Sequence, residues 1–281
     1  MKLISSYDNY PIENNRWGLG NKFEDTLIMT SLSLLYASQH YDVTFYTTDK
    51  MKKILNFLPV NIKVFDKKFN YPEDTWVESK FYAMSKQTKP FIHIDTDVFL
   101  YKEIFNKYKN SPVIIERPEM GEDFLPHYPP QLNFWNDYVL KDHQKWDKNL
   151  NYSFNCGTLG FNDMNLKDDF IKSYYNLKEE FNKNKKAYRI YKKRGSEPCI
   201  VLEQYNLASL CKKSNIKVDF ILPYSNRKTQ SEAAKQIGYT HLSGNVKYNK
   251  DIIKRIHQRF KINFPSQYKK LQNRINKFLK T

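Results

Sequence analysis

Two aspartates one residue apart carry the strongest chemical signal in this sequence. Asp95 and Asp97 follow the apolar run Phe91–Ile94, and apolar residues resume directly after them. Carboxylates at the end of a buried strand are costly unless a cation or hydrogen bonds compensate their charge. Paired hard oxygen ligands suit Mg²⁺ or Mn²⁺, and such an ion in turn bridges the phosphates of a diphosphate. The segment therefore predicts a divalent-cation site with Asp95 and Asp97 as ligands.

An aspartate pair at this spacing also arises by chance in a chain with 17 Asp, so the position after an apolar strand carries the argument. In the alternative interpretation, Asp95 and Asp97 cap the turn that follows the strand. His93 lies just upstream, and we expect it to be a core histidine rather than a ligand.

A histidine, a glycine and a lysine form a second pattern far downstream. His241 offers an imidazole that can bind a metal, Gly244 allows close backbone approach, and Lys247 offers a cation for phosphate oxygens. A lone histidine is more often structural than a ligand, so this pattern is weak by itself. Together with the aspartate pair it becomes much more specific, because the ion and the lysine can meet one diphosphate.

The elements that must position these residues alternate between strands and helices in the first half of the chain. Strands separated by helices favour right-handed crossovers and a mainly parallel sheet, and ligands of such sheets bind outside the carboxyl ends of the strands. Segment 117–150, with four prolines, is expected to be irregular and exposed. Hydrophobic periodicity predicts strands at 2–6, 43–47, 61–65, 90–94, 112–115, 154–161 and 218–222, and helices at 23–39, 50–58, 74–86, 166–184 and 198–211.

The net charge of +16 is concentrated in two segments. Residues 183–194 contain seven basic residues and no acidic one, and residues 250–281 contain ten basic residues against Asp251. A nucleic-acid-binding protein normally carries its basic stripe over the fold itself, so no nucleic acid is expected as a partner. The two segments are either solvated surface or a site for an anionic partner.

Hydropathy and cysteine usage indicate the compartment. No run approaches the ~18 apolar residues of a membrane-spanning helix, and the first residues lack the apolar core of a signal peptide. Cys156, Cys199 and Cys211 are odd in number and lack zinc-site spacing, which favours a reducing cytoplasm.

The two patterns together resemble the signature of GT-A glycosyltransferases. The resemblance is greatest to family eight, which includes glycogenin and bacterial lipooligosaccharide galactosyltransferases, and the segment 91–100 also looks like a bacterial group of uncharacterised GT-A-like proteins. The chain departs from family eight where Tyr248 and Asn249 replace the usual Pro-Trp, and where Glu203 replaces an aspartate. Three further segments are similar to family motifs in the expected order: Ser79-Lys80-Phe81, Phe154-Asn155-Cys156-Gly157-Thr158-Leu159 and Glu203-Gln204-Tyr205-Asn206-Leu207.

The resemblance implies a role for each matching residue. Asp95, Asp97 and His241 would bind Mn²⁺ or Mg²⁺. The implied donor-binding residues are Lys80, Asn155, Gly157, Gly244 and Lys247, and the implied catalytic residues are Glu203 and Gln204. The alternatives are an ordinary helix lysine at position 80, a tight strand turn at 155–157, and the solvated side of a helix at 203–204.

The fold class that the resemblance implies is a GT-A, Rossmann-like α/β domain over residues 1–249, followed by a basic amphipathic helical tail over 250–281. The implied function is metal-dependent transfer of a sugar from a nucleotide sugar, with a UDP-sugar favoured, to a saccharide or lipid-linked acceptor. The alternative is a catalytically inactive GT-A-like binding protein for anionic surfaces. We expect a cytoplasmic protein whose tail either contacts the inner face of the membrane or packs on the domain.

Overall fold

The computed structural model describes residues 1–14, 18, 20–69, 76–139, 143, 145–191 and 197–278. The chain folds into two compact units. Unit 1 comprises residues 1–68, 93–106 and 234–281, and unit 2 comprises residues 69–92 and 107–233. Each unit is therefore discontinuous in sequence.

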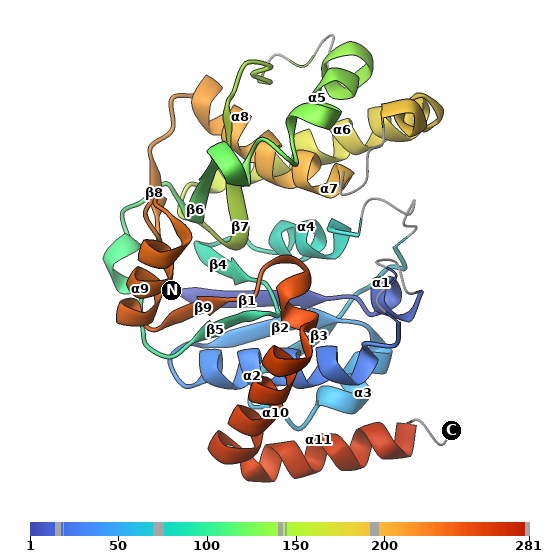
Figure 1. The fold of residues 1–281 in the computed structure, drawn as a ribbon, viewed down its shortest axis with the longest axis vertical. Helices are drawn as coiled ribbons and strands as arrows, with labels where there is room; N and C mark the ends of the chain where they lie inside the picture. The colour runs from blue at the N-terminus through green and yellow to red at the C-terminus, as the bar shows by residue number, and fades with distance from the viewer. Residues whose placement is uncertain are drawn as a thin grey trace. The chain divides into compact units, whose positions relative to one another are not determined.

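A mixed, mainly parallel sheet of seven strands is found within the described residues, in the order β3-β2-β1-β4-β7-β6-β8 (Figure 1). Helices flank its strands, so the α/β class expected from the sequence is confirmed. The strands of this sheet are β1 (Lys2–Tyr7), β2 (Val43–Thr47), β3 (Asn61–Val64), β4 (Phe91–Ile94), β6 (Val113–Met120), β7 (Tyr152–Phe161) and β8 (Val218–Phe220).

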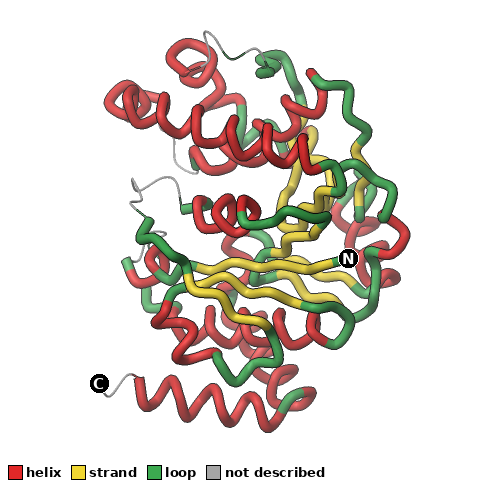
Figure 2. Tube along the Cα trace, turned by 180° about the vertical axis from the view of Figure 1, so that it is seen from behind, coloured by secondary structure: helices red, strands yellow, loops and turns green. Residues whose placement is uncertain are grey.

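In unit 1, β1, β2 and β3 form a parallel group. Leu3 pairs with Val43, and Thr44 pairs with Asn61. A short helix, α1 (Tyr10–Glu13), follows β1, and α2 (Phe23–Ser38) and α3 (Asp49–Leu55) lie along one face of these strands (Figure 2). α2 is buried at nearly every position, as expected for a helix that is apolar or small on all sides.

Two basic helices follow in unit 1. α10 (Lys250–Asn263) is capped by the Asn249 side chain, which accepts from the backbone N–H groups of Asp251 and Ile252. α11 (Pro265–Phe278) starts at a proline, whose missing N–H is harmless in the first helical turn. α10 packs on α2, and α11 packs on α2 and α3 (Figure 1). The buried apolar residues of the two helices are Ile256, Phe260, Leu271 and Ile275.

A second sheet within unit 1 has two antiparallel strands, β5 (Val98–Leu100) and β9 (Tyr239–His241). Val98 pairs with His241 and Leu100 with Tyr239. We did not expect either strand from the sequence, because three residues give no measurable alternation and the partner strand lies far along the chain. This pairing places the residue before β5 next to the end of β9.

In unit 2, β7 pairs antiparallel with β6, and β8 pairs parallel with the other edge of β6. The β6–β7 register shifts between Ile115 and Arg117, a bulge of the kind that redirects side chains. The long helix α6 (Met164–Tyr191) packs on α4 (Glu78–Ser85) and α8 (Asn206–Lys213). Phe81 of α4 stacks on Tyr174 of α6 with ring centroids 3.6 Å apart.

Within the segment 117–150, residues 117–139 contain regular elements that the sequence did not predict, and residues 140–142 and 144 lie outside the described residues. β6 continues to Met120, a 3₁₀ turn covers Gly121–Asp123, and α5 (Pro129–Phe134) runs into a π-helical turn, Trp135–Val139. Phe134 and Trp135 are fully buried, so tertiary packing decides the conformation here. The expected helix 198–211 is confirmed as α7 (Pro198–Ile200), a π-helical turn (Val201–Tyr205) and α8.

Two other helices differ from the expectation. α9 (Arg227–Ile237) was not expected, and α4 is shorter than the predicted helix 74–86, whose start at Asp74 lies outside the described residues. No helix in the described part of the chain combines the length and the apolar character needed to cross a bilayer.

Candidate functional site

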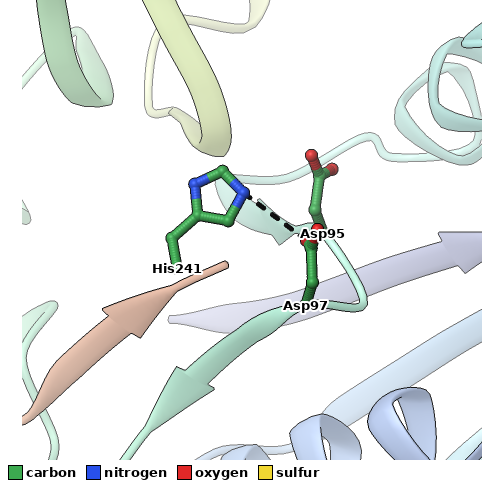
Figure 3. Close-up of side chains that lie close together, drawn as sticks. All are labelled: Asp95, Asp97 and His241. Atoms are coloured by element: carbon green, nitrogen blue, oxygen red, sulfur yellow. Dashed lines mark ion pairs between the residues drawn. The ribbon is translucent and has the colours of Figure 1, made fainter. Parts of the chain in front are cut away.

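Asp95, Asp97 and His241 come together in unit 1 (Figure 3). One ligand atom from each side chain lies within 4.8 Å of the other two. Asp97 directly precedes β5 and His241 ends β9, so the pairing of these strands places His241 Nε2 3.5 Å from Asp97 Oδ1. The Asp97 and His241 side chains are 5% and 8% exposed, whereas that of Asp95 is 37% exposed. The cluster therefore has two buried potential ligands and one that solvent can reach.

Lys247 joins this cluster from the 3₁₀ segment Gly244–Tyr248. Its Nζ donates to Asp97 Oδ2 at 2.6 Å. Burial would raise the pKa of Asp97, but Lys247 and His241 hold that pKa well below its usual range. Burial would also lower the pKa of Lys247, but Asp97 raises it instead. Carboxylate and ammonium are therefore both charged at neutral pH.

The backbone conformation at position 244 explains why a glycine occurs there. Its φ of +64° lies in the left-handed region, where side chains other than glycine are strained. No heavy atom lies within 4 Å of the position that a Cβ would occupy. The backbone conformation, rather than crowding, explains the glycine between His241 and Lys247.

The donor set fits a divalent ion of the Mg²⁺ or Mn²⁺ class. Carboxylate oxygens suit these ions, and an imidazole nitrogen is a better ligand for Mn²⁺ than for Mg²⁺. Lys247 contacts Oδ2 of Asp97, and Oδ1 of the same carboxylate faces His241. His93 is 1% exposed and lies 2.9 Å from Ser6 Oγ, so it is a core histidine, as expected.

A second group of candidate residues lies in unit 2. Lys80 of α4 and Glu203 of the π-helical turn form an ion pair with 2.7 Å between Nζ and Oε1, and their side chains are only 6% and 8% exposed. Lys80 also donates to the backbone oxygen of Cys156 in β7. These contacts exclude both an ordinary solvated lysine at position 80 and a solvated glutamate at 203.

Asn155 belongs to a neighbouring polar network in unit 2. Its Nδ2 donates to Glu119 Oε1 at 2.9 Å, and its Oδ1 accepts from the backbone N–H of Gly157 at 3.1 Å. Tyr128 donates its hydroxyl proton to Glu119 Oε2 at 2.7 Å. Arg117 lies 3.6 Å from Glu119, and it lies closer to Asp123, at 2.8 Å. The network is largely buried.

Gln204 completes this network through its amide nitrogen. Tyr128 has one hydroxyl proton, which Glu119 accepts, so the contact between Tyr128 and Gln204 needs a donor on the glutamine. When the Gln204 amide is turned so that its nitrogen faces Tyr128, that nitrogen also donates to Glu119 Oε2 at 3.2 Å and to the Phe154 backbone oxygen at 3.3 Å. Burial raises the pKa of Glu119 against the opposing effect of its hydrogen bonds.

The structure thus gathers the sequence-derived candidates into one group in each unit. Unit 1 holds the residues from the aspartate pair and the histidine pattern, and unit 2 holds Lys80, Asn155, Gly157, Glu203 and Gln204. Sequence reasoning missed Glu119 and Tyr128. An acidic residue four positions past the apolar run 112–115 was the available signal, but we had expected that segment to be an exposed loop.

The fold is similar to that of solved glycosyltransferase structures. The apo structure of the bifunctional glycosyltransferase WbbM matches with 11% identity and a TM-score of 0.53, over 98% of this chain and 51% of that chain. The galactosyltransferase LgtC in complex with donor and acceptor sugar analogues matches with 11% identity and a TM-score of 0.47, over 92% of this chain and 94% of that one. Mouse xyloside xylosyltransferase 1 matches with 12% identity and a TM-score of 0.43, over 87% and 98% of the two chains.

The likeness to WbbM shows a shared fold, and the GT-A fold expected from the sequence is confirmed. This chain spans about half the length of the WbbM chain. No curated protein matches the sequence significantly. The chain belongs to a family of unknown function, DUF6734, whose profile matches residues 1–274.

Proposed function

We propose that this protein is a metal-dependent glycosyltransferase that uses a nucleotide-sugar donor. The observation that carries the proposal is the cluster of Asp95, Asp97 and His241 with Lys247 on Asp97, since it offers ligands for a divalent ion and a fixed cation beside them. The fold shared with a glycosyltransferase supports it. The motif resemblance favours a UDP-sugar as donor and a saccharide or lipid-linked molecule as acceptor.

Asp95, Asp97 and His241 would hold Mn²⁺ or Mg²⁺. The ion would supply Lewis-acid stabilisation for the negative charge that develops on the leaving nucleoside diphosphate. Lys247 would add a second positive charge for the same phosphates. Its ammonium is ordered by Asp97 Oδ2, and a preorganised cation needs no rearrangement as the charge develops.

The candidate residues of unit 2 would bind the donor sugar and act at its anomeric carbon. Lys80 would donate to the donor sugar or its phosphate, with Glu203 keeping it charged in a buried position. Asn155 and Gly157 would line the sugar pocket, and Glu203 and Gln204 would act at the anomeric carbon. Glu119 and Tyr128 would be positioning residues, since their hydrogen bonds fix the side chains of Asn155 and Gln204.

The test of this proposal is thermal stabilisation by Mn²⁺ and UDP, alone and together. We expect UDP to stabilise the wild-type protein only with the metal, by about 2.7 kcal/mol at a ligand concentration 100-fold above Kd. Asp97→Asn should abolish the metal-dependent part, because it removes a charged ligand at nearly constant shape. The matched control is Asp42→Asn, an exposed aspartate of unit 1, which should respond as the wild type does.

A screen of nucleotide sugars for metal-dependent hydrolysis would then identify the donor. If no nucleoside diphosphate raises the melting temperature with Mn²⁺ or Mg²⁺ present, the glycosyltransferase proposal is wrong. A binding protein for anionic surfaces would then be the remaining reading.

We also propose that the protein is cytoplasmic and that exposed basic residues of α10 and α11 contact an anionic membrane. The three cysteines are odd in number and buried, which suits a reducing compartment. The apolar residues of both helices are packed within unit 1, so contact would be electrostatic, about 1 kcal/mol per basic residue. These exposed basic residues are Lys250, Lys254, Arg255, Lys261, Lys269, Lys270 and Lys277. Arg259 is also exposed, but it donates to the Tyr101 hydroxyl.

Sedimentation with vesicles tests this contact. We expect the full chain to sediment with phosphatidylglycerol vesicles at low salt and to be released at high salt, and charge reversal at Lys269, Lys270 and Lys277 should weaken sedimentation. Equal sedimentation of the wild type and the reversed variant would exclude α11 from the contact.

A further inference from the structure

A basic pocket of about 380 Å³ lies in unit 1 at the first turns of α2 and α10. Three lysines line it: Lys22 from the start of α2, and Lys250 and Lys254 from the first turns of α10. Tyr248 and Ile253 provide the apolar part of the lining. The volume lies at the small end of the range of ligand pockets, roughly 300–1,000 Å³.

The carboxylate that lines the pocket, Asp25, already has two basic neighbours. Asp25 lies 3.5 Å from Lys22 and 3.6 Å from His257, which also lines the pocket. The neighbouring His257 ring, and then the charge of Lys22, lower the pKa of Asp25 against the opposing effect of burial. The ammonium groups of Lys250 and Lys254 have no ion pair or hydrogen bond within the described parts of the chain. The pocket therefore carries a surplus of positive charge.

Lys250 and Lys254 occupy positions in α10 where a positive charge destabilises the helix. They are four residues apart in α10, and like charges at this spacing destabilise a helix. Lys250 also lies in the first turn, where the helix dipole is positive and a cation is unfavourable. Departures from local rules of this kind are expected at functional sites. A bound anion would remove both penalties.

We propose that this pocket binds a phosphate ester, that is, a phosphate group carried by a small polar molecule. The ammonium groups of Lys22, Lys250 and Lys254 are charged donors for phosphate oxygens, and a dianion would neutralise their surplus over Asp25. The volume leaves room for a group of the size of glycerol or a monosaccharide beside the phosphate. Tyr248, whose hydroxyl lies 3.3 Å from Thr26 Oγ1, would contact that group with its ring.

This site does not depend on the proposed glycosyl transfer. None of Asp95, Asp97 and His241 lines the pocket, and Lys247 directs its ammonium to Asp97 instead. A phosphate ester of this size occurs both in soluble metabolites and in the headgroup of phosphatidic acid. The two sources share the same recognition chemistry and can be separated by experiment.

The decisive experiment is titration calorimetry on the full chain in EDTA, so that no divalent ion is available. The probes are inorganic phosphate and glycerol 3-phosphate, with glycerol as the neutral control at matched ionic strength. The double variant Lys250→Gln/Lys254→Gln should weaken binding of both anions at least tenfold. Lys52→Gln/Lys68→Gln removes the same charge from exposed positions of unit 1 outside the pocket and outside α10 and α11 and should change the affinity less than twofold.

Sedimentation with phosphatidic acid vesicles, against phosphatidylglycerol vesicles of equal surface charge, distinguishes the sources. A preference for phosphatidic acid that disappears in Lys250→Gln/Lys254→Gln assigns the pocket to a lipid headgroup, whereas binding of glycerol 3-phosphate without such a preference assigns it to a soluble ester. The proposal is overturned if neither anion nor phosphatidic acid binds, or if the two double variants lose affinity equally. It is also overturned if Asp97→Asn abolishes phosphate binding, because the phosphate would then lie at the metal cluster.

Discussion

Lys247 and Asp97 each hold the other in its charged state inside the protein. Asp97 is 4% exposed, and its carboxylate has the Lys247 ammonium on one oxygen and the His241 ring near the other. Without these neighbours a buried carboxylate would be strongly disfavoured. The same arrangement that keeps this carboxylate charged would therefore position a cation for phosphate.

Lys247→Ala should separate phosphate recognition from nucleoside recognition. A charge-assisted hydrogen bond to phosphate contributes roughly 1.5–3 kcal/mol, so we expect UDP to bind on the order of 10- to 100-fold more weakly in the presence of Mn²⁺. Uridine should bind almost unchanged, because it has no phosphate. Calorimetric titration of both ligands checks this, and an equal loss for the two ligands would show that Lys247 does not contact the diphosphate.

The buried Glu119 side chain gives a prediction for how the stability of the protein depends on pH. Burial raises its pKa in the folded state, so the folded protein holds this proton more tightly than the unfolded chain. The associated stability is present below the unfolded pKa of about 4.3 and is lost as pH rises through the folded-state value.

Glu119→Gln removes this titration. The melting temperature of the variant, relative to wild type, should therefore rise between pH 4 and pH 7 in a series of thermal melts. Glu122→Gln, at an exposed position, is the control. A difference that stays constant with pH would contradict the raised pKa.

At the residue level, the sequence predicted the metal cluster better than the polar network around Glu119. Asp95 and Asp97 follow a strand that is visible as an apolar run, and the spacing of His241 and Lys247 has a direct chemical interpretation. Glu119 lies beyond a bulge in β6 and Tyr128 just before α5. Their contact with Asn155 and Gln204 depends on tertiary packing, which no local pattern encodes.

Helix α11 is held to unit 1 by a narrow apolar stripe, which gives a prediction at the scale of an element. Leu271 is fully buried where α11 packs on α2 and α3. Leu271→Ala should lower the free energy of unfolding by about 2–5 kcal/mol, because a buried leucine leaves a cavity. Lys270→Ala, at the adjacent exposed position, should change it by less than ~0.5 kcal/mol. Urea unfolding of the two variants makes the comparison, and similar midpoints would mean that α11 is not docked in solution.

The elements that the sequence predicted well are those with long, regular patterns. β2 begins and ends at the expected residues, and the start of α2 at Phe23 is also confirmed. The short strands β5 and β9 and the helix α5 were missed for different reasons. β5 and β9 are fixed by each other across the chain, and α5 starts at prolines that also signal a loop.

At the scale of the whole molecule, the reactivity of the three cysteine thiols measures whether the core stays closed to solvent. Cys156, Cys199 and Cys211 are at most 2% exposed, and burial raises the pKa of Cys211 to about 12. A buried thiol with a raised pKa reacts slowly, because the thiolate is the nucleophile. We expect no thiol to react rapidly with Ellman's reagent at pH 8 in the native protein, and all three to react after unfolding in guanidinium. A thiol that reacts quickly without denaturant would reveal an opening of the fold near that cysteine.

The pairing of β5 with β9 also constrains the order in which the protein can be assembled on the ribosome. Asp97 is synthesised long before its partner His241, and β5 has no other strand beside it in their two-stranded sheet. Until residues 239–241 emerge, β5 is an unpaired strand edge, which other chains can recognise. The nascent chain therefore acquires its candidate ion site only after β9 has been synthesised, and a product that stops before β9 would lack that site and be prone to aggregate.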